Sequence, residues 1–175
     1  MARLFHLCWL LFVVAVLGLA PYLPDEVGDP GKTMGRDAFV VFILAMGVFV
    51  PLQCTLGVRW IASRWPDAIN LPNKAHWWAP ERRAASMAWL TAHMHGLALQ
   101  TVLLFAGLFY GALQDGQPTW PQLGPVEWAA GALLLGLWFG LWIWQVHRRF
   151  PAPTAGATAG PMRQPSHPMR APRRD

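Results

Sequence analysis

Four long apolar runs constrain the fold of this chain more than any other feature. They lie at residues 4–20, 38–57, 84–113 and 126–145, and the polar sequence falls between and after them. About 20 apolar residues is the length that crosses a bilayer as an α-helix. Only 13% of the residues are charged, against about 25% in a typical soluble domain. The sequence therefore predicts a membrane protein.

The expected fold class is all-α, a membrane-embedded four-helix bundle. The spans are predicted at residues 4–21, 38–58, 84–113 and 126–147, within one domain covering residues 1–150. Residues 151–175 are rich in Pro, Ala and Arg and carry no apolar stripe, which predicts a disordered cytoplasmic tail. The first run also resembles a secretory signal, but Pro21 directly follows its only small-residue cleavage site and favours an uncleaved helix.

The basic residues predict how the chain is threaded. Twelve of the 14 Lys and Arg residues lie before the first run, between the second and third runs, or after the fourth. The other two, Lys32 and Arg36, lie in the first loop. Because Lys and Arg concentrate on the cytoplasmic side, both termini are expected in the cytoplasm. The abundance of Arg over Lys, with many Ala and Gly, suggests a bacterial chain, and so a multi-pass protein of the bacterial inner membrane.

The segment between the second and third runs carries most of the recognisable side chains. Its central part, residues 70–83 (NLPNKAHWWAPERR), is termed the collar. Trp favours the headgroup layer and Arg can reach lipid phosphate, so the collar is expected on the membrane surface. It either anchors the third helix or forms a binding site. The candidate binding residues are Asn70, Asn73, Trp77, Trp78, Glu81, Arg82 and Arg83.

Three polar side chains, His93, His95 and Gln100, lie within the third run. Polar groups inside a membrane are costly and are often functional. The two histidines point to different faces of a helix, so they cannot form one bidentate site. A b-type haem would need an axial partner on another helix, either His6 or His147. The simpler interpretation is that these side chains are hydrogen-bonded inside the bundle.

Pro51 lies inside the second run and is expected to kink its helix. Proline frees one backbone carbonyl, and Gln53 or Thr55 on the next turn are candidates to satisfy it. The kink, together with the histidines, keeps a small transporter open as an alternative function. Small-xxx-small spacings at residues 107–111 and 136–140 predict that the third and fourth helices pack closely.

No catalytic motif is present in the sequence. It has no GxSxG, HExxH, Walker loop or CxxC pattern, and the acidic first loop lacks the ligand ladder of a calcium site. Cys8 and Cys54 lie in apolar runs and are expected to be buried as small apolar residues. We therefore expect no enzyme activity, metal or cofactor. The expected partners are the lipid bilayer and another membrane protein, and no nucleic acid, because there is no basic groove.

Several short motifs resemble a family of bacterial integral membrane proteins of unknown function, distantly similar to SdpI-type immunity and signalling proteins. The matching pieces are LPDEV at 23–27, GRDAF at 35–39, NLPNK at 70–74, the Trp pair at 77–78, ERR at 81–83 and Phe150. The resemblance implies a four-helix membrane protein and an accessory, immunity-like or signalling role. It departs from the family at residues 28–34, which are shortened and lack the usual His.

Overall fold

The computed structural model describes residues 2–153, and the expected tail lies almost entirely outside them. Its elements are α1 (Ala2–Leu19), η1 (Ala20–Tyr22), β1 (Glu26–Val27), β2 (Met34–Gly35), α2 (Arg36–Leu52), η2 (Gln53–Gly57), α3 (Val58–Arg64), η3 (Pro66–Ala68), α4 (Lys74–Trp77), α5 (Pro80–Gly116) and α6 (Pro125–Arg149).

Within residues 2–153, four helices are long and apolar enough to cross a membrane, as the sequence predicts. The first runs through η1, the second is α2–η2–α3 in one continuous rod, and the others are α5 and α6. Each begins and ends a few residues outside its apolar run. Pro80 and Pro125 open α5 and α6 at the first helical position, where the missing N–H removes no intrahelical bond.

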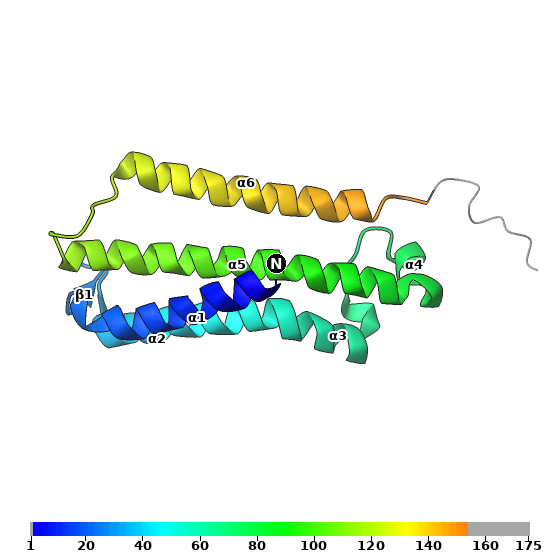
Figure 1. The fold of residues 1–175 in the computed structure, drawn as a ribbon, viewed down its shortest axis with the longest axis horizontal. Coiled ribbons are helices and arrows are strands. Elements are labelled where there is room, and N and C mark those ends of the chain that lie inside the picture. The colour runs from blue at the N-terminus through cyan, green and yellow to red at the C-terminus, as the bar shows by residue number, and fades with distance from the viewer. Residues whose placement is uncertain (1, 154–175) are drawn as a thin grey trace, which may run out of the picture.

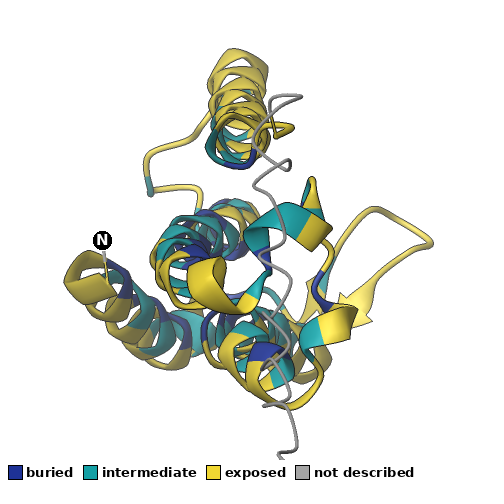
Figure 2. Cartoon of the chain, turned by 90° about the vertical axis from the view of Figure 1, so that its right-hand side faces the viewer, coloured by how far each residue is buried: buried dark blue, intermediate teal, exposed yellow. Residues whose placement is uncertain are grey.

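Three of the helices, α1, α2 and α5, share one apolar core, while α6 lies apart from it. The core is formed by interlocking side chains such as Phe12, Val16, Ile43 and Val102, all at most 5% exposed. No residue of α6 is buried, and Figure 2 shows that helix almost entirely in the colour of exposed residues. A second buried cluster surrounds Phe150 and joins the end of α6 to the collar.

The first loop contains a β-hairpin of two residues a strand, in which Glu26 pairs with Gly35. Its turn needs glycine, because Gly28 and Gly31 both have positive φ angles, at 121° and 84°. Arg36 forms an ion pair of 3.3 Å with Asp25 across the hairpin base. The loop is thus more ordered than its glycines alone predict.

The carbonyl freed by Pro51 belongs to Gly47, and its partner comes from another helix. The Trp9 indole N–H of α1 donates to the Gly47 carbonyl at 3.0 Å. The expectation that Gln53 or Thr55 would satisfy this carbonyl is therefore wrong. Thr55 instead donates to the Pro51 carbonyl at 2.9 Å, within the π-helical turn η2. Thr55 lies one helical turn after Pro51 and can reach its carbonyl, whereas Gly47 lies about two turns away from Thr55.

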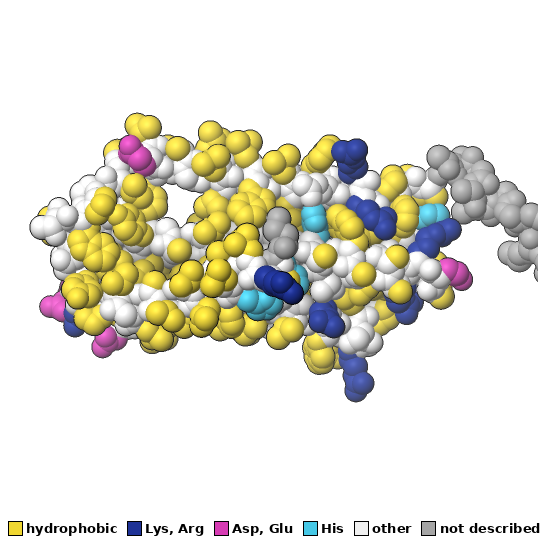
Figure 3. Space-filling model, viewed as in Figure 1, with side chains coloured by type: hydrophobic (Ala, Val, Ile, Leu, Met, Phe, Trp, Pro, Cys, Tyr) yellow, Lys and Arg dark blue, Asp and Glu magenta, His cyan; other side chains and the backbone are white. Residues whose placement is uncertain are grey.

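The prediction that α5 and α6 pack closely through their glycines is also wrong. Gly136 and Gly140 have nothing within 4 Å of a built Cβ position. On α5, Gly111 faces the Trp128 ring, with 3.1 Å from the built Cβ to Cζ2. Because a bulky ring rather than a helix backbone fills this space, the two helices stay apart. Figure 3 shows an opening between α6 and the rest of the molecule.

Candidate functional site

The collar fastens the end of α6 to the start of α5. Phe150, just after the last turn of α6, is fully buried. Its ring lies edge-on to Trp77 at 5.9 Å and to Trp89 at 5.3 Å between centroids. The Asn73 side-chain amide donates to the Phe150 carbonyl at 2.8 Å, and the Trp77 indole donates to the Pro151 carbonyl at 2.9 Å. These five residues are termed the clasp.

Asn73 also has a backbone role in the clasp. It takes the left-handed conformation, with φ 53° and ψ 40°, directly before the single turn of α4. Asn tolerates this conformation better than other residues that have a Cβ. One residue thus both turns the chain and binds the end of α6. Arg149 lies over the Trp77 ring at 5.2 Å from its centroid and adds a cation–π contact.

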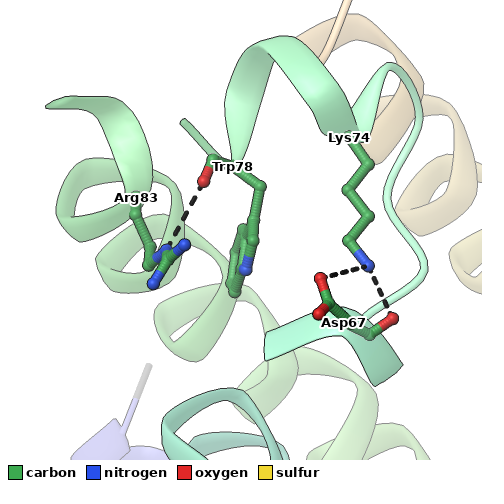
Figure 4. Close-up of polar contacts among 4 residues, drawn as sticks. All are labelled: Asp67, Lys74, Trp78 and Arg83. Atoms are coloured by element: carbon green, nitrogen blue, oxygen red, sulfur yellow. Dashed lines mark hydrogen bonds and ion pairs between the residues drawn. The ribbon is translucent and has the colours of Figure 1, made fainter. Parts of the chain in front are cut away.

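A second set of contacts holds the collar to neighbouring elements, and Figure 4 shows part of it. Trp78 is 6% exposed, and Arg83 donates from Nε to its carbonyl at 3.4 Å. Lys74 reaches back to Asp67, with Nζ at 2.5 Å from the carbonyl and 3.8 Å from Oδ1. The buried Ser86 hydroxyl donates to the Trp77 carbonyl at 2.9 Å. These bonds make the collar an ordered structure rather than a free loop.

The remaining candidate residues face outward. Asn70, Glu81 and Arg82 are exposed. Arg82 lies 3.3 Å from His76 Nδ1 and donates to the His76 carbonyl at 3.4 Å. An open pocket of about 520 Å³ lies beside them. Its lining residues are Asn73, Lys74, Ala75, His76, Arg82 and Pro153. The collar therefore combines an inner face that holds the fold and an outer, mainly basic face.

His93 lies in an aromatic stack between α5 and α6. Its ring is 4.2 Å from Trp89 and 5.9 Å from Trp142, and both are nearly parallel to it. Trp142 also donates its indole N–H to the His93 carbonyl at 3.3 Å. His93 Nε2 is buried and has no hydrogen-bond partner among the described residues. Because its ring stacks with one tryptophan of α5 and one of α6, His93 acts as packing between these helices.

His95 points to a different side of α5, as its two-residue spacing from His93 predicts. It faces His6 of α1, with 6.0 Å between ring centroids. The crevice at this pair holds about 160 Å³, below the roughly 300–1,000 Å³ of pockets for drug-sized ligands. A porphyrin does not fit between these two rings as the helices are packed. His147, the other candidate axial ligand, is exposed near the end of α6.

Gln100 is buried and bridges α5 to the middle of α6. Its side-chain amide donates to the Leu135 carbonyl at 2.5 Å, while its Oε1 has no partner in the described part of the chain. Within residues 2–153, no three His, Cys, Asp or Glu side chains gather as a metal site would require. The core between α1, α2 and α5 consists mainly of apolar side chains, and α5 also carries the buried polar side chains of Gln100 and Gln114.

Sequence reasoning missed three residues of this region: Trp89, Ser86 and the role of Phe150. The available signal for Phe150 was its position between a basic pair and a proline. The basic pair alone is enough to end a membrane span, so an aromatic residue at this position points to another role. Trp89 and Ser86 carried no separate signal, because they fit the apolar run around them.

Comparisons with family models, curated proteins and solved structures find no match to this chain. The resemblance to the bacterial membrane-protein family therefore stays a prediction that rests on the short motifs.

Proposed function

We propose that this chain is a non-enzymatic protein of the bacterial inner membrane that acts by binding another membrane protein through the outer face of its collar. Four helices of membrane-spanning length and hydropathy support the location. Both termini and the collar then lie in the cytoplasm. In Figure 3 most Lys and Arg side chains lie in the right-hand half, around the collar, and most Asp and Glu side chains lie near the opposite end. The positive-inside rule assigns the right-hand end to the cytoplasm.

The observation that carries the binding role is the length of α5. It has 37 residues, or about 55 Å of helix, whereas the hydrocarbon core is about 30 Å thick. The helix is therefore about 25 Å longer than the hydrocarbon core. We place this extra length at its N-terminal end, where the exposed residues are charged or small (residues 81–85). Exposed leucines, Leu103, Leu104 and Leu108, appear only in its C-terminal half. The start of α5 thus projects into the cytoplasm.

The clasp gives this projection a fixed shape. The end of α6, the collar and the start of α5 are joined by the buried Phe150 and by two side-chain hydrogen bonds to the chain after α6. A chain that only needed to anchor a helix at the headgroups would require Trp and Arg, but not a structured projection with a pocket. Lys74, His76 and Arg82 on the pocket wall make it suited to an acidic segment of the partner.

A site-specific photocrosslinker at Ala75, on the pocket wall, tests this proposal in native membranes. We expect one protein adduct of defined mass, which disappears with Arg82→Glu at unchanged protein level. The matched control places the crosslinker at the exposed Leu134 of α6, far from the collar. Equal adducts at both positions, unaffected by Arg82→Glu, would overturn the binding role.

A further inference from the structure

A crevice separate from the collar lies where α1 meets η2, α3 and α5. Three side chains able to carry positive charge line it, each from a different element: His6 of α1, Arg59 of α3 and His95 of α5. Its other lining residues are Phe5, Trp9, Leu52, Thr55 and Leu56. Figure 1 shows the start of α1, marked N, about half-way along the molecule, and α1 packs against α5.

The π-helical turn η2 contributes to this arrangement. A π turn has one residue more than an α turn, so it rotates the side chains that follow by about 100° relative to a continuous α-helix. Thr55, within this turn, is 6% exposed, and Arg59 follows two residues after it ends. Leu52, Thr55, Leu56 and Arg59 all line the crevice, so the residues of this turn and those on either side of it share that face. π turns occur frequently at functional sites.

Hydrogen bonding fixes which histidine nitrogens are free to bind. His6 Nδ1 lies 2.7 Å from the Ala2 carbonyl and His95 Nδ1 lies 2.8 Å from the Thr91 carbonyl. A carbonyl can only accept, so each Nδ1 carries the proton. Nε2 of each ring is then left for a ligand, and it becomes a second N–H donor when the ring is charged.

The positive charge of Arg59 is not balanced by an acidic side chain in the crevice. No Asp or Glu lines it, and Arg59 has no ion pair within residues 2–153. The Arg59 guanidinium can donate charge-assisted hydrogen bonds to a phosphate in this small space, and each imidazole can do so from Nε2 when its ring is charged. A metal ion suits the site less well, because Arg59 would repel it and zinc sites normally use at least three protein ligands.

The depth of the crevice also suits a phosphate. His95 lies about 31 Å along α5 from its end at Gly116, which is close to the hydrocarbon thickness of about 30 Å. In the proposed orientation the crevice is at the level of the cytoplasmic headgroups. Its volume of about 160 Å³ equals roughly five water molecules, enough for a phosphate group. We propose that this crevice binds a phosphate group, supplied by an anionic phospholipid headgroup or by a soluble phosphate.

Native mass spectrometry of the delipidated full-length protein tests this inference, with phosphatidylglycerol, phosphatidylcholine and inorganic phosphate as probes. Tighter retention of phosphatidylglycerol than of inorganic phosphate would assign the headgroup as the source, and the reverse would assign a soluble phosphate. In either case Arg59→Gln and His95→Gln should weaken binding of the preferred probe by at least about tenfold. Arg64→Gln, the matched control farther along α3, should leave it unchanged.

Circular dichroism of each variant separates loss of binding from loss of fold. If Arg59→Gln fails to fold, His6→Gln provides the same test, because His6 lines the crevice and is exposed. Binding that is identical in all variants and the Arg64 control would overturn the proposal. Retention of Zn²⁺ in place of any phosphate probe would also overturn it, in favour of a metal site. Neither result bears on the photocrosslinking at the collar.

Discussion

The hydrogen bond from Trp9 to the carbonyl of Gly47 yields the sharpest prediction about stability. Proline at position 51 has no N–H, so the Gly47 carbonyl lacks its partner within the helix. Trp9→Phe removes the substitute donor and should destabilise the bundle. Pro51→Ala restores an N–H at the right position, so Trp9→Phe should cost less in that background.

The expected magnitude follows from the surroundings of this bond. Hydrogen bonds between membrane helices average about 0.6 kcal/mol in double-mutant cycles and reach about 1.7 kcal/mol. The Trp9–Gly47 bond is 3.0 Å long and partly buried, and Pro51 leaves the carbonyl without its usual helical donor. We therefore expect a coupling free energy of about 1 kcal/mol between Trp9→Phe and Pro51→Ala.

Trp78→Phe is the matched control, because it removes the same atoms without removing a hydrogen bond. Trp78 is buried, and its indole nitrogen has no hydrogen-bond partner within residues 2–153. The assay is unfolding of the purified protein in mixed micelles with increasing denaturing detergent, followed by circular dichroism so that changes in indole fluorescence do not interfere. Trp9→Phe should lower the free energy of unfolding more than Trp78→Phe does.

The reasoning would be refuted if Trp9→Phe lowered the free energy of unfolding equally in the unsubstituted chain and in the Pro51→Ala variant. The loss would then come from the missing volume of the indole alone. A larger loss in the Pro51→Ala variant would also contradict it, since the carbonyl there has its own helical partner.

Three further predictions concern the clasp, the threading and the tail. Phe150→Ala should lower the free energy of unfolding by about 3–5 kcal/mol in the same assay. The control Phe49→Ala, at a position 60% exposed on α2, should lower it far less. Equal losses would show that the clasp does not stabilise the fold. A periplasm-active reporter should be active when fused after Asp115 and inactive after Pro151, and activity at the second site would reverse the proposed threading. Truncation after Pro153 should leave the thermal midpoint in detergent unchanged, because every bond of the clasp is kept; a lower midpoint would show that the removed residues dock on the bundle.

The sequence predicted which residues make up the candidate site, but not which of them hold the fold together and which face outward. The residue types of the collar marked it as special, and its exposed Arg82 and Glu81 agree with a surface position. The local sequence does not show that Asn73 and Trp77 hydrogen-bond to the end of α6, because their partners Phe150 and Pro151 lie more than 70 residues away in the chain. The same holds for His6 and His95, which face each other from separate helices.

The sequence by itself determined the four helices and their approximate ends. Inside a bilayer, an apolar run of spanning length can satisfy its backbone hydrogen-bonding groups only as a helix. This constraint acts within each run and does not depend on the other helices. The tertiary structure alone decided the pairings between helices. Glycines that predict close packing remain unused on α6 because Trp128 occupies the space at Gly111. Likewise Trp9, rather than a nearby polar side chain, satisfies the Gly47 carbonyl, because packing of α1 against α2 brings its donor within reach.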